Sequence, residues 1–346
     1  MSTHSHEGPE CCKSPKPGRK ITWWVVGGSL FLGGIALFIP PLRSFGTAFW
    51  EYIRLVGWAV LVGLGVGGVI DRFVPKEYIS KILAQPKKRT VFYATGLGIL
   101  ASTCSHGILA LSMEIHRKGA SGPAVISFLL ASPWANFPVT LLLFGLFGWK
   151  GFLIIVMAAC VALTTGLVFQ GLDQKGWIEK NPHTAHLEES FSFSEDFKNR
   201  IRSYRPSFSQ FKADLIAVVQ GTLELSEMVL GWVMFGILLA SLIQAYVPTH
   251  FFHAYLGPSL PGLLATLFFA TIIEVCSEGT APLAFEIYRQ TQAIGNSFVF
   301  LSAGVITDYT EIGLVWSNLG RRTALWMVGL GVPQILFWGF LLNRLF

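Results

Sequence analysis

Two short, related groups of polar residues interrupt otherwise apolar stretches of this 346-residue chain. They are Cys104-Ser105-His106-Gly107 and, at an offset of 172 positions (276 − 104), Cys276-Ser277-Glu278-Gly279. Thiolates favour soft metals and metalloids, whereas an imidazole or a carboxyl group can carry a proton. A lone membrane cysteine is more often a small buried hydrophobe. Because these two cysteines occupy corresponding positions in polar surroundings, we expect them to contact a solute.

The same offset aligns residues well beyond these two tetrads, which indicates an internal repeat. The identities are Leu111 with Leu283, Glu114-Ile115 with Glu286-Ile287, Arg117 with Arg289, Phe128-Leu129 with Phe300-Leu301, Ala131 with Ala303, Leu142 with Leu314, and Gly148 with Gly320. With a one-residue gap, Gly57-Trp58 also matches Gly231-Trp232 and Val74-Pro75 matches Val247-Pro248. We therefore divide the chain into a first repeat, 50–170, and a second repeat, 213–346.

The acidic residues distinguish the two repeats. Glu274, Glu278, Asp308 and Glu311 in the second repeat align with Ser102, His106, Asn136 and Val139 in the first. A carboxylate at the centre of a bilayer costs about 2.5–3.5 kcal/mol, so such acids are functional candidates unless they are paired or lie near the interface. We expect Glu278, Asp308 and Glu311 to couple transport to protons. Charge pairing is the structural alternative, and His106 is either a proton carrier or ligand, or a histidine satisfied by a neighbouring helix.

Composition identifies the environment of these residues. The chain is 52% hydrophobic and 13% charged, with a mean hydropathy of +0.54, whereas a soluble domain is about 25% charged. Apolar runs such as 21–40, 52–70, 152–169, 223–246 and 323–342 approach the ~20 residues that span a bilayer. Helices satisfy their own backbone in lipid, and the runs do not alternate as barrel strands do. The predicted fold class is an all-α polytopic membrane protein.

Loop charge predicts the orientation of the repeats. The loop after the opening helix of the first repeat carries six cations: Arg72, Lys76, Lys81, Lys87, Lys88 and Arg89. The corresponding loop, 247–261, has no Lys or Arg. Because cations mark cytoplasmic loops, the repeats should have inverted topology with a solute site between them. A disordered cytoplasmic tail (1–20), an extra transmembrane helix (21–40) and a cytoplasmic loop (171–212) complete the predicted organisation, with the C-terminus outside.

Each repeat should also contain one broken membrane segment. These are Gly122–Gly148, where Pro133 and Pro138 disturb the helix, and Gly295–Gly320, which the polar run 307–311 interrupts. Broken backbone at this depth is tolerated beside protein or a water-filled cavity. On a helix, each tetrad cysteine would share a stripe with the tetrad glycine and with Glu114 or Glu286. The glycines would permit close approach by a helix or ligand.

Other classes of function find less support. The net charge of +6 comes from scattered clusters and not from a nucleic-acid-binding face, and the chain lacks a phosphate-binding Gly-x-x-x-x-Gly-Lys motif, so we expect no bound ATP. Five cysteines without regular spacing do not form a disulfide framework. His4, His6, Cys11 and Cys12 are a weak metal-capture signal because they lack zinc-finger spacing. We expect no resident metal, no cofactor and no enzymatic activity.

The tetrad segments resemble a predicted permease family that includes the organoarsenical efflux permeases. The resemblance rests on CSHGILALSMEIHRKGASGPAVISFLLASPWAN, EVCSEGTAPLAFEIYRQ and FVFLSAG, and it covers most of residues 50–340. It implies transport, with trivalent organoarsenicals or other thiol-reactive species as the substrate class. Relatives that handle soft species often have a second cysteine where this chain has His106. That difference argues against a vicinal-thiol mechanism.

The sequence therefore favours a secondary efflux transporter in a prokaryotic cytoplasmic membrane. Solute contacts are expected from Cys104, Ser105, His106, Asn136, Cys276 and Ser277. Two alternatives stay open: a channel or passive permease subunit, which would tolerate neutral acids, and an intramembrane thiol oxidoreductase, which would need Cys104 close to Cys276. The expected partners are a small-molecule substrate and the lipid bilayer, and the sequence leaves a homo-oligomer possible.

Overall fold

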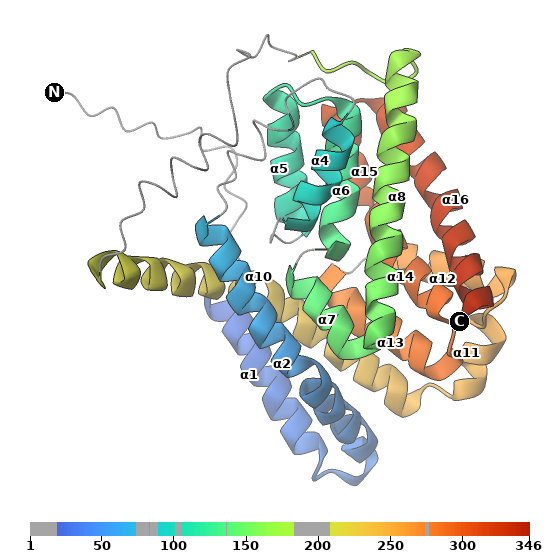
Figure 1. The fold of residues 1–346 in the computed structure, drawn as a ribbon. Coiled ribbons are helices and arrows are strands. Elements are labelled where there is room, and N and C mark those ends of the chain that lie inside the picture. Colours follow the sequence, from blue (N-terminus) through green and yellow to red (C-terminus); the bar gives the residue numbers. More distant parts are fainter. Residues whose placement is uncertain are drawn as a thin grey trace.

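The structure is a computed structural model that describes residues 19–73, 83, 89–100, 105–135, 137–182, 208–273 and 277–346. Within these ranges the chain is all-helical (Figure 1). Among the expected site residues, Cys104, Asn136 and Cys276 lie outside the described residues, as do the tail 1–18 and most of the loop 171–212. Ser105 and His106 begin a helix, but their side chains are not described.

The first two long helices form an antiparallel pair. Helix α1 is Arg19–Ala36, the 3₁₀ turn η2 is Pro40–Leu42, and α2 is Arg43–Phe73. Sequence reasoning extended the first helix to residue 40, but it ends four residues earlier, and Pro40 and Pro41 form the turn instead. Proline lacks an amide hydrogen and suits the first position of a new helical turn. Helix α1 also packs on the long helix α10, Phe208–Tyr246.

Among the described residues, five further helices of the first repeat have counterparts in the second. Those of the first repeat are α4 (Thr90–Leu100), α5 (Ser105–Arg117), α6 (Gly122–Ala135), α7 (Phe137–Phe147) and α8 (Trp149–Gln174). Those of the second are α12 (Leu260–Ile273), α13 (Ser277–Thr291), α14 (Ile294–Ile306), α15 (Tyr309–Asn318) and α16 (Arg321–Leu345), preceded by the short α11 (Thr249–Tyr255). Both sets share one packing pattern: α6 contacts α4, α5 and α8 as α14 contacts α12, α13 and α16.

The helices bend within the two segments that the sequence predicted to be broken. Helices α6 and α7 meet at a 44° bend, and α14 and α15 at 40°. Pro138 fits the first turn of α7, where a missing amide hydrogen costs nothing. The described part of the first tetrad opens α5 at Ser105, and that of the second opens α13 at Ser277. Residues 101–104 and 274–276, which include both tetrad cysteines, lie outside the described residues, so the shared stripe stays a prediction.

Helices α6 and α14 form the centre of the molecule. Every described side chain from Pro123 to Pro133 of α6 is buried, as is every one from Ile294 to Ala303 of α14. The identical pairs Phe128-Leu129 and Phe300-Leu301 lie within these stretches. A helix that is apolar on all sides is typically buried on all sides. Their repeated identity is explained by this shared core position.

Helices α8 and α16 run past each other in opposite directions (Figure 1). Each is preceded by a glycine with positive φ, Gly148 at 57° and Gly320 at 118°, a conformation that side chains with a Cβ rarely adopt. Gln334 of α16 joins them, because its Oε1 accepts a hydrogen bond from Thr164 Oγ1 at 2.6 Å and its Nε2 donates to Thr165 Oγ1 at 3.1 Å.

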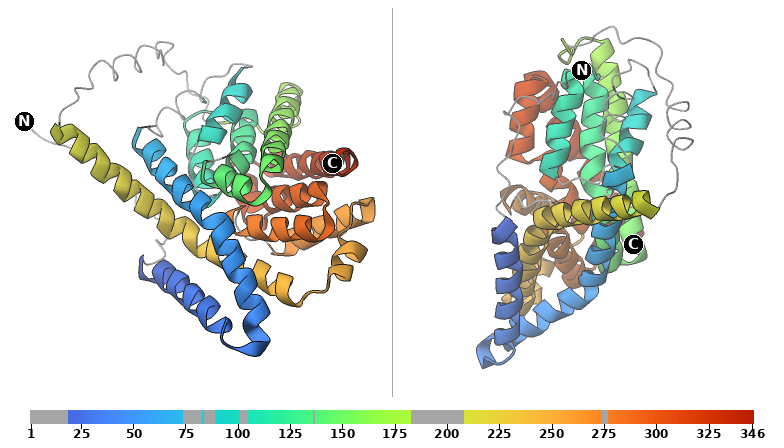
Figure 2. Two further views of the ribbon diagram at one scale, coloured as in Figure 1. Left: turned by 60° about the horizontal axis from the view of Figure 1, so that its bottom comes forward. Right: turned by 90° about the vertical axis from the view of Figure 1, so that its left-hand side faces the viewer.

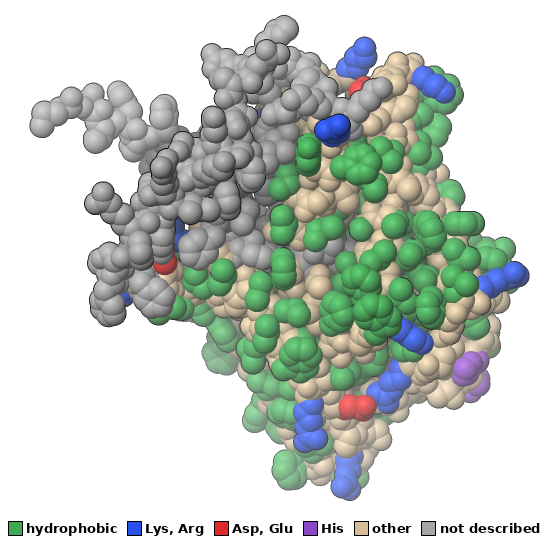
Figure 3. Space-filling model, in the orientation of Figure 1, with side chains coloured by type: hydrophobic (Ala, Val, Ile, Leu, Met, Phe, Trp, Pro, Cys, Tyr) green, Lys and Arg blue, Asp and Glu red, His purple; other side chains and the backbone are tan. Residues whose placement is uncertain are grey.

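By length and composition, four described helical segments can cross a membrane: Pro40–Val69, Trp149–Gln174, Asp214–Tyr246 and Arg321–Leu345. Bent pairs raise the number to as many as seven. Figure 3 shows hydrophobic side chains filling the middle of one face, with charged side chains mainly above and below them. Helices α2 and α10 cross beside the bundle (Figure 2). The chain is built as a multi-pass membrane protein.

Candidate functional site

Helix α13 places Glu278 and Ser277 at its buried beginning. Glu278 is 2% exposed and Ser277 is 4% exposed. Ser277 Oγ donates to Glu278 Oε2 at 3.1 Å, and Thr280 Oγ1 donates to the Ser277 carbonyl at 3.0 Å. A carboxylate in the first turn of a helix is stabilised by the helix dipole. The second tetrad thus supplies a polar, titratable helix start inside the protein.

A second helix meets α13 directly at this tetrad. A Cβ added to Gly236 of α10 would overlap the backbone carbonyl of Gly279. Small residues allow such close backbone approach in membrane proteins. Helix α10 therefore covers the beginning of α13 one residue after Glu278, and the glycine that permits this approach is Gly236.

Asp308 lies at the bend between α14 and α15, and it caps α15. Its Oδ1 accepts hydrogen bonds from Thr310 N at 2.6 Å, Thr310 Oγ1 at 2.6 Å and Glu311 N at 3.3 Å. Aspartate is a favoured N-cap because it satisfies amides that have no partner within the helix. This carboxylate stabilises the helix break, whatever its further role.

Glu311 occupies the first turn of α15 and is only 3% exposed. Its Oε2 is buried and has no hydrogen-bond partner among the described residues. The corresponding residue in the first repeat, Val139, is 0% exposed. An unsatisfied buried polar atom is uncommon in native proteins and calls for an explanation. Since an apolar side chain fills the equivalent position, packing alone does not require the acid.

Glu286 is a third buried acid, which the sequence reasoning weighed but left out of the expected site. It is 1% exposed and accepts hydrogen bonds from Tyr52 Oη of α2 and, at 2.6 Å, from Gln290 Nε2. One turn away, Arg289 pairs with Glu51 at 3.1 Å. The signal that could have identified Glu286 is its alignment with Glu114, but that match does not reveal which of the two is buried.

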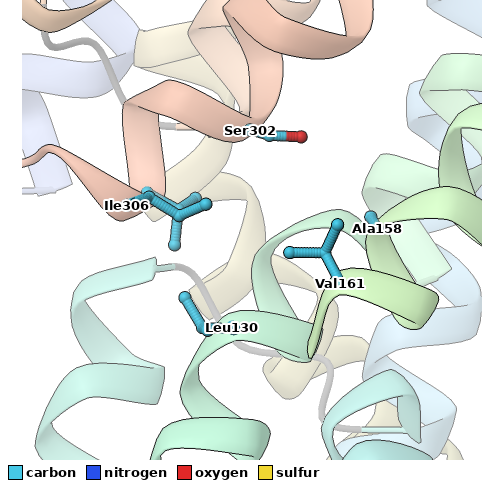
Figure 4. Close-up of a pocket in the computed structure, with 6 residues that line it drawn as sticks. Leu130, Ala158, Val161, Ser302 and Ile306 are labelled. Carbon is cyan, nitrogen blue, oxygen red and sulfur yellow. The ribbon is translucent and has the colours of Figure 1, made fainter. Parts of the chain in front are cut away.

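A small cavity lies where the repeats meet, between α6, α8 and α14 (Figure 4). Its lining residues are Leu130, Ala158, Val161, Ser302, Val305 and Ile306. Leu130 and Ser302 are equivalent in the two repeats (302 − 130 = 172). About 10 Å³ is available to the centre of a water molecule, roughly the space that one water needs. The central contact of the repeats is thus narrow and mostly apolar.

The structure brings some expected site residues together. Asp308 and Glu311 share one helical turn, whereas Glu278 and Ser277 lie on α13, which packs against α14. Within the described part of the chain, no three His, Cys, Asp or Glu side chains form a group that could hold a metal ion. The described free cysteine, Cys160 on α8, belongs to neither tetrad.

Comparison with known proteins identifies the family. A family model described as a predicted permease matches residues 42–218 and 214–346, two consecutive segments that agree with the two repeats. A Mycobacterium tuberculosis protein provisionally named permease Rv2963 is 25% identical over 292 residues, covering 79% of this chain and 70% of the relative. Bacillus subtilis YcgR is 22% identical over 270 residues, 76% of this chain and 84% of the relative.

A Streptococcus mutans protein provisionally named as a subunit of a two-component membrane permease complex is 21% identical over 273 residues, covering 78% of this chain and 85% of the relative. No solved structure gives a significant match. The family match covers the helices from α2 to α16 and agrees with the apolar, repeatedly membrane-crossing architecture. The chain belongs to the predicted permease family and is a multi-pass membrane permease of that family.

Proposed function

We propose that this permease is a proton-coupled secondary transporter that exports a small thiol-reactive solute. The observation that carries the proposal is the buried, unpartnered Oε2 of Glu311 at a helix break, where the first repeat has Val139. An ionised carboxylate is costly at membrane depth, so this group favours the neutral, protonated form until water or a cation reaches it. Such a change of environment is how a transporter can load and release a proton.

Inverted repeats would allow alternating access. Two features support the inversion: the contrast in loop charge and the opposite directions of α8 and α16. In Figure 1, α4, α5 and α6 lie toward one end of the bundle together with α15, whereas α12, α13 and α14 lie toward the other with α7. Movement of one repeat against the other could expose a midmembrane site to each side in turn. The proposed topology keeps the N-terminal tail and the loop 171–212 in the cytoplasm.

The proposed solute site combines the two tetrads with Asn136. Cys104, Ser105, His106, Cys276, Ser277 and Asn136 would contact the solute. The beginning of α13 supports this assignment for the second tetrad, because Ser277 lies buried beside Glu278. The substrate class, trivalent organoarsenicals or similar soft species, rests on the family resemblance and on the affinity of thiolates for soft elements.

Each of the three acids would have a different role in proton coupling. Glu311 would carry the proton, and Glu278, beside Ser277, would respond near the solute to the protonation of Glu311. Asp308 would maintain the break between α14 and α15 by capping α15. The Streptococcus mutans relative is named as a complex subunit. With a partner protein, this chain would form the solute path of a larger assembly.

Uptake into everted membrane vesicles tests the proposal. With a proton gradient, vesicles containing the full chain should accumulate a trivalent methylated arsenical and exclude a pentavalent one that does not react with thiols. Glu311→Gln and Glu278→Gln should each abolish gradient-driven uptake at normal protein level. Glu114→Gln, a matched change at an exposed acid, should leave it intact. Uptake that does not depend on the proton gradient and is unchanged in both variants would favour a passive channel instead.

The cysteines can be tested in the same vesicles. Cys104→Ser and Cys276→Ser should each reduce uptake of the trivalent arsenical without changing protein level, because serine cannot replace a soft thiolate ligand. Cys160→Ser is the control, since this thiol lies on α8 and belongs to neither tetrad. Formation of a Cys104–Cys276 disulfide during turnover would favour the oxidoreductase alternative.

A further inference from the structure

A groove of about 530 Å³ opens at the end of the bundle where α8 ends and α16 begins. Its lining residues are Gly176, Trp177, Arg322, Leu325, Trp326 and Gly329. The proposed solute path uses none of them. The groove also joins the two repeats, because its walls come from the segment after α8 and from the first turns of α16.

Local sequence fixes the first wall. Helix α8 ends in a turn with Gly176 at φ 70°, and Trp177 N donates back to the Leu172 carbonyl at 2.9 Å, the hydrogen bond of a glycine-terminated helix end. The chain then continues through buried Ile178. Asn181 Nδ2 anchors it by donating to the carbonyls of His116 and Ala120 at 2.6 and 2.7 Å. Trp177 is therefore held on a fixed support.

Glu179 ties this wall to α16. Its two carboxylate oxygens accept hydrogen bonds from Arg322 N at 2.9 Å and from Thr323 N at 3.0 Å. The amides at the start of α16 thus already donate hydrogen bonds to a carboxylate. An anion in the groove would therefore be attracted by side chains and not by uncapped amides of the helix. Across the groove, the rings of Trp177 and Trp326 stack with centroids 6.0 Å apart and an interplanar angle of 24°.

The groove combines apolar surface with positive charge. Trp177 is 52% exposed and Leu325 is 63% exposed, while the Lys175 ammonium lies 5.7 Å from the centre of the Trp177 ring. The two segments that form the groove, residues 173–180 and 321–329, carry the basic residues Lys175, Lys180, Arg321 and Arg322 and the acidic residues Asp173 and Glu179. Since the Glu179 carboxylate is already hydrogen-bonded to amides of α16, the basic side chains of these segments outweigh the acidic ones. The border of the groove therefore attracts anions.

The location favours a lipid over a soluble anion. Both walls lie at the ends of helices that can cross a membrane, so the groove opens where headgroups meet acyl chains. Only 28% of the most apolar part of α16 is buried, against 39–44% in the other three spans, so α16 faces lipid most openly. Tryptophan rings and basic side chains are the groups that proteins place at this depth.

We propose that this groove is a binding site for an anionic phospholipid. The phosphate would lie between Arg322 and Lys175, and one acyl chain would cover Leu325 and Trp326 toward Gly329. Zwitterionic lipids would bind less well, because their ammonium group offsets the attraction of the phosphate to these cations. A lipid held here would contact both repeats, and its binding does not depend on the proposed transport.

The first test measures lipid-dependent stability of the purified full chain in detergent. Phosphatidylglycerol should raise Tm, and phosphatidylcholine with the same acyl chains should do so less. Arg322→Gln and Lys175→Gln should each weaken the phosphatidylglycerol effect about fivefold in apparent affinity, as expected for one cation at a membrane surface. Arg344→Gln is the control, because Arg344 stacks 4.6 Å from the Phe340 ring at the opposite end of α16.

The second test locates the acyl chain. Phosphatidylglycerol with brominated chains should quench tryptophan fluorescence, and Trp177→Phe combined with Trp326→Phe should remove the component that saturates at low lipid content. Trp232→Phe, a change at an exposed tryptophan on α10, should not remove it. Equal effects of both lipids, loss of the effect in Arg344→Gln, or full protection by soluble glycerol phosphate would each overturn the proposal.

Discussion

The two repeats have the same arrangement of helices, but acidic residues at equivalent positions lie in different environments. In the first repeat, Glu114 of α5 is 58% exposed at its side chain and pairs with Lys118 at 2.8 Å. Its equivalent in the second repeat, Glu286 of α13, is buried against Tyr52 and Gln290. At the next comparable position, Val139 and Glu311 are both buried, but only one is an acid.

This difference distinguishes the residues that a repeat needs in order to fold from the acidic residues that only the second repeat buries. The first repeat forms the same set of helices with an apolar Val139 and a surface Glu114. The second repeat makes those helices while burying three carboxyl groups, those of Glu278, Glu286 and Glu311. Positions at which a protein accepts the cost of a buried carboxyl group are commonly functional. The asymmetry therefore agrees with our proposal that the second repeat couples transport to protons.

Making the repeats alike at position 311 should have the largest effect. Glu311→Val copies the first repeat, so we expect the fold to persist and the free energy of unfolding to stay level or rise by about 1–3 kcal/mol, because an unpaired buried carboxyl is removed. Gradient-driven transport should fall at least tenfold. Thermal unfolding in detergent and vesicle uptake measure the two effects, and a stable variant that transports normally would contradict the coupling role.

The buried network at Glu286 should be the next most sensitive. In a double-mutant cycle, Tyr52→Phe and Glu286→Gln should show a coupling energy of about 1–3 kcal/mol in unfolding free energy, because a buried carboxyl loses its donor. Glu114→Gln should change stability by less than about 0.5 kcal/mol, as expected for an exposed pair. Additive effects at Tyr52 and Glu286 would show that the hydrogen bond contributes little.

The contact between α10 and α13 should respond to a single methyl group. Gly236→Ala places a Cβ on the Gly279 carbonyl, so we expect a loss of about 1–3 kcal/mol from overpacking and a shift of the Glu278 helix start. Gly57→Ala on α2 is the matched control, because its Cβ meets nothing within 4 Å. Equal stability of both variants would mean that α10 can move away from α13 at little cost.

The smallest expected effect concerns the caps of α8 and α16. The described Gly148 gives α8 no side-chain cap, whereas Glu179 caps α16. Burial acts to raise the pKa of Glu179, but hydrogen bonds from Arg322 N and from Thr323 outweigh it and hold the pKa below its ordinary value. The folded state therefore binds this proton less readily than the unfolded state does.

The sign of the pH dependence follows from this lowered pKa. The cap's contribution is present above the ordinary glutamate pKa and is lost as the pH falls through the folded-state value. Glu179→Gln should remove that part of the acid sensitivity in thermal unfolding, and Asp173→Gln provides a comparison near the same groove. An unchanged acid profile in Glu179→Gln would mean that the cap adds no stability.

Much of the architecture was predictable from local sequence. Composition identified a helical membrane protein, the 172-residue offset identified the repeats, and Pro138 and the polar run at Asp308 located the two bent segments. The family match and the helix pattern agree with these predictions. Convergence of the two tetrad cysteines stays a prediction.

The sequence by itself determined that the chain lies in a lipid bilayer, that it contains two repeats, and which residues are available for chemistry. These properties depend on hydrophobicity and on spacing along the chain. Only the tertiary structure decided which acids are buried. Glu114 and Glu286 have the same local context, yet Tyr52, 234 positions from Glu286, covers just one of them. Likewise, the groove beside Trp177 depends on how separate segments pack. Burial is a property of neighbours that folding brings together, and local pattern cannot specify it.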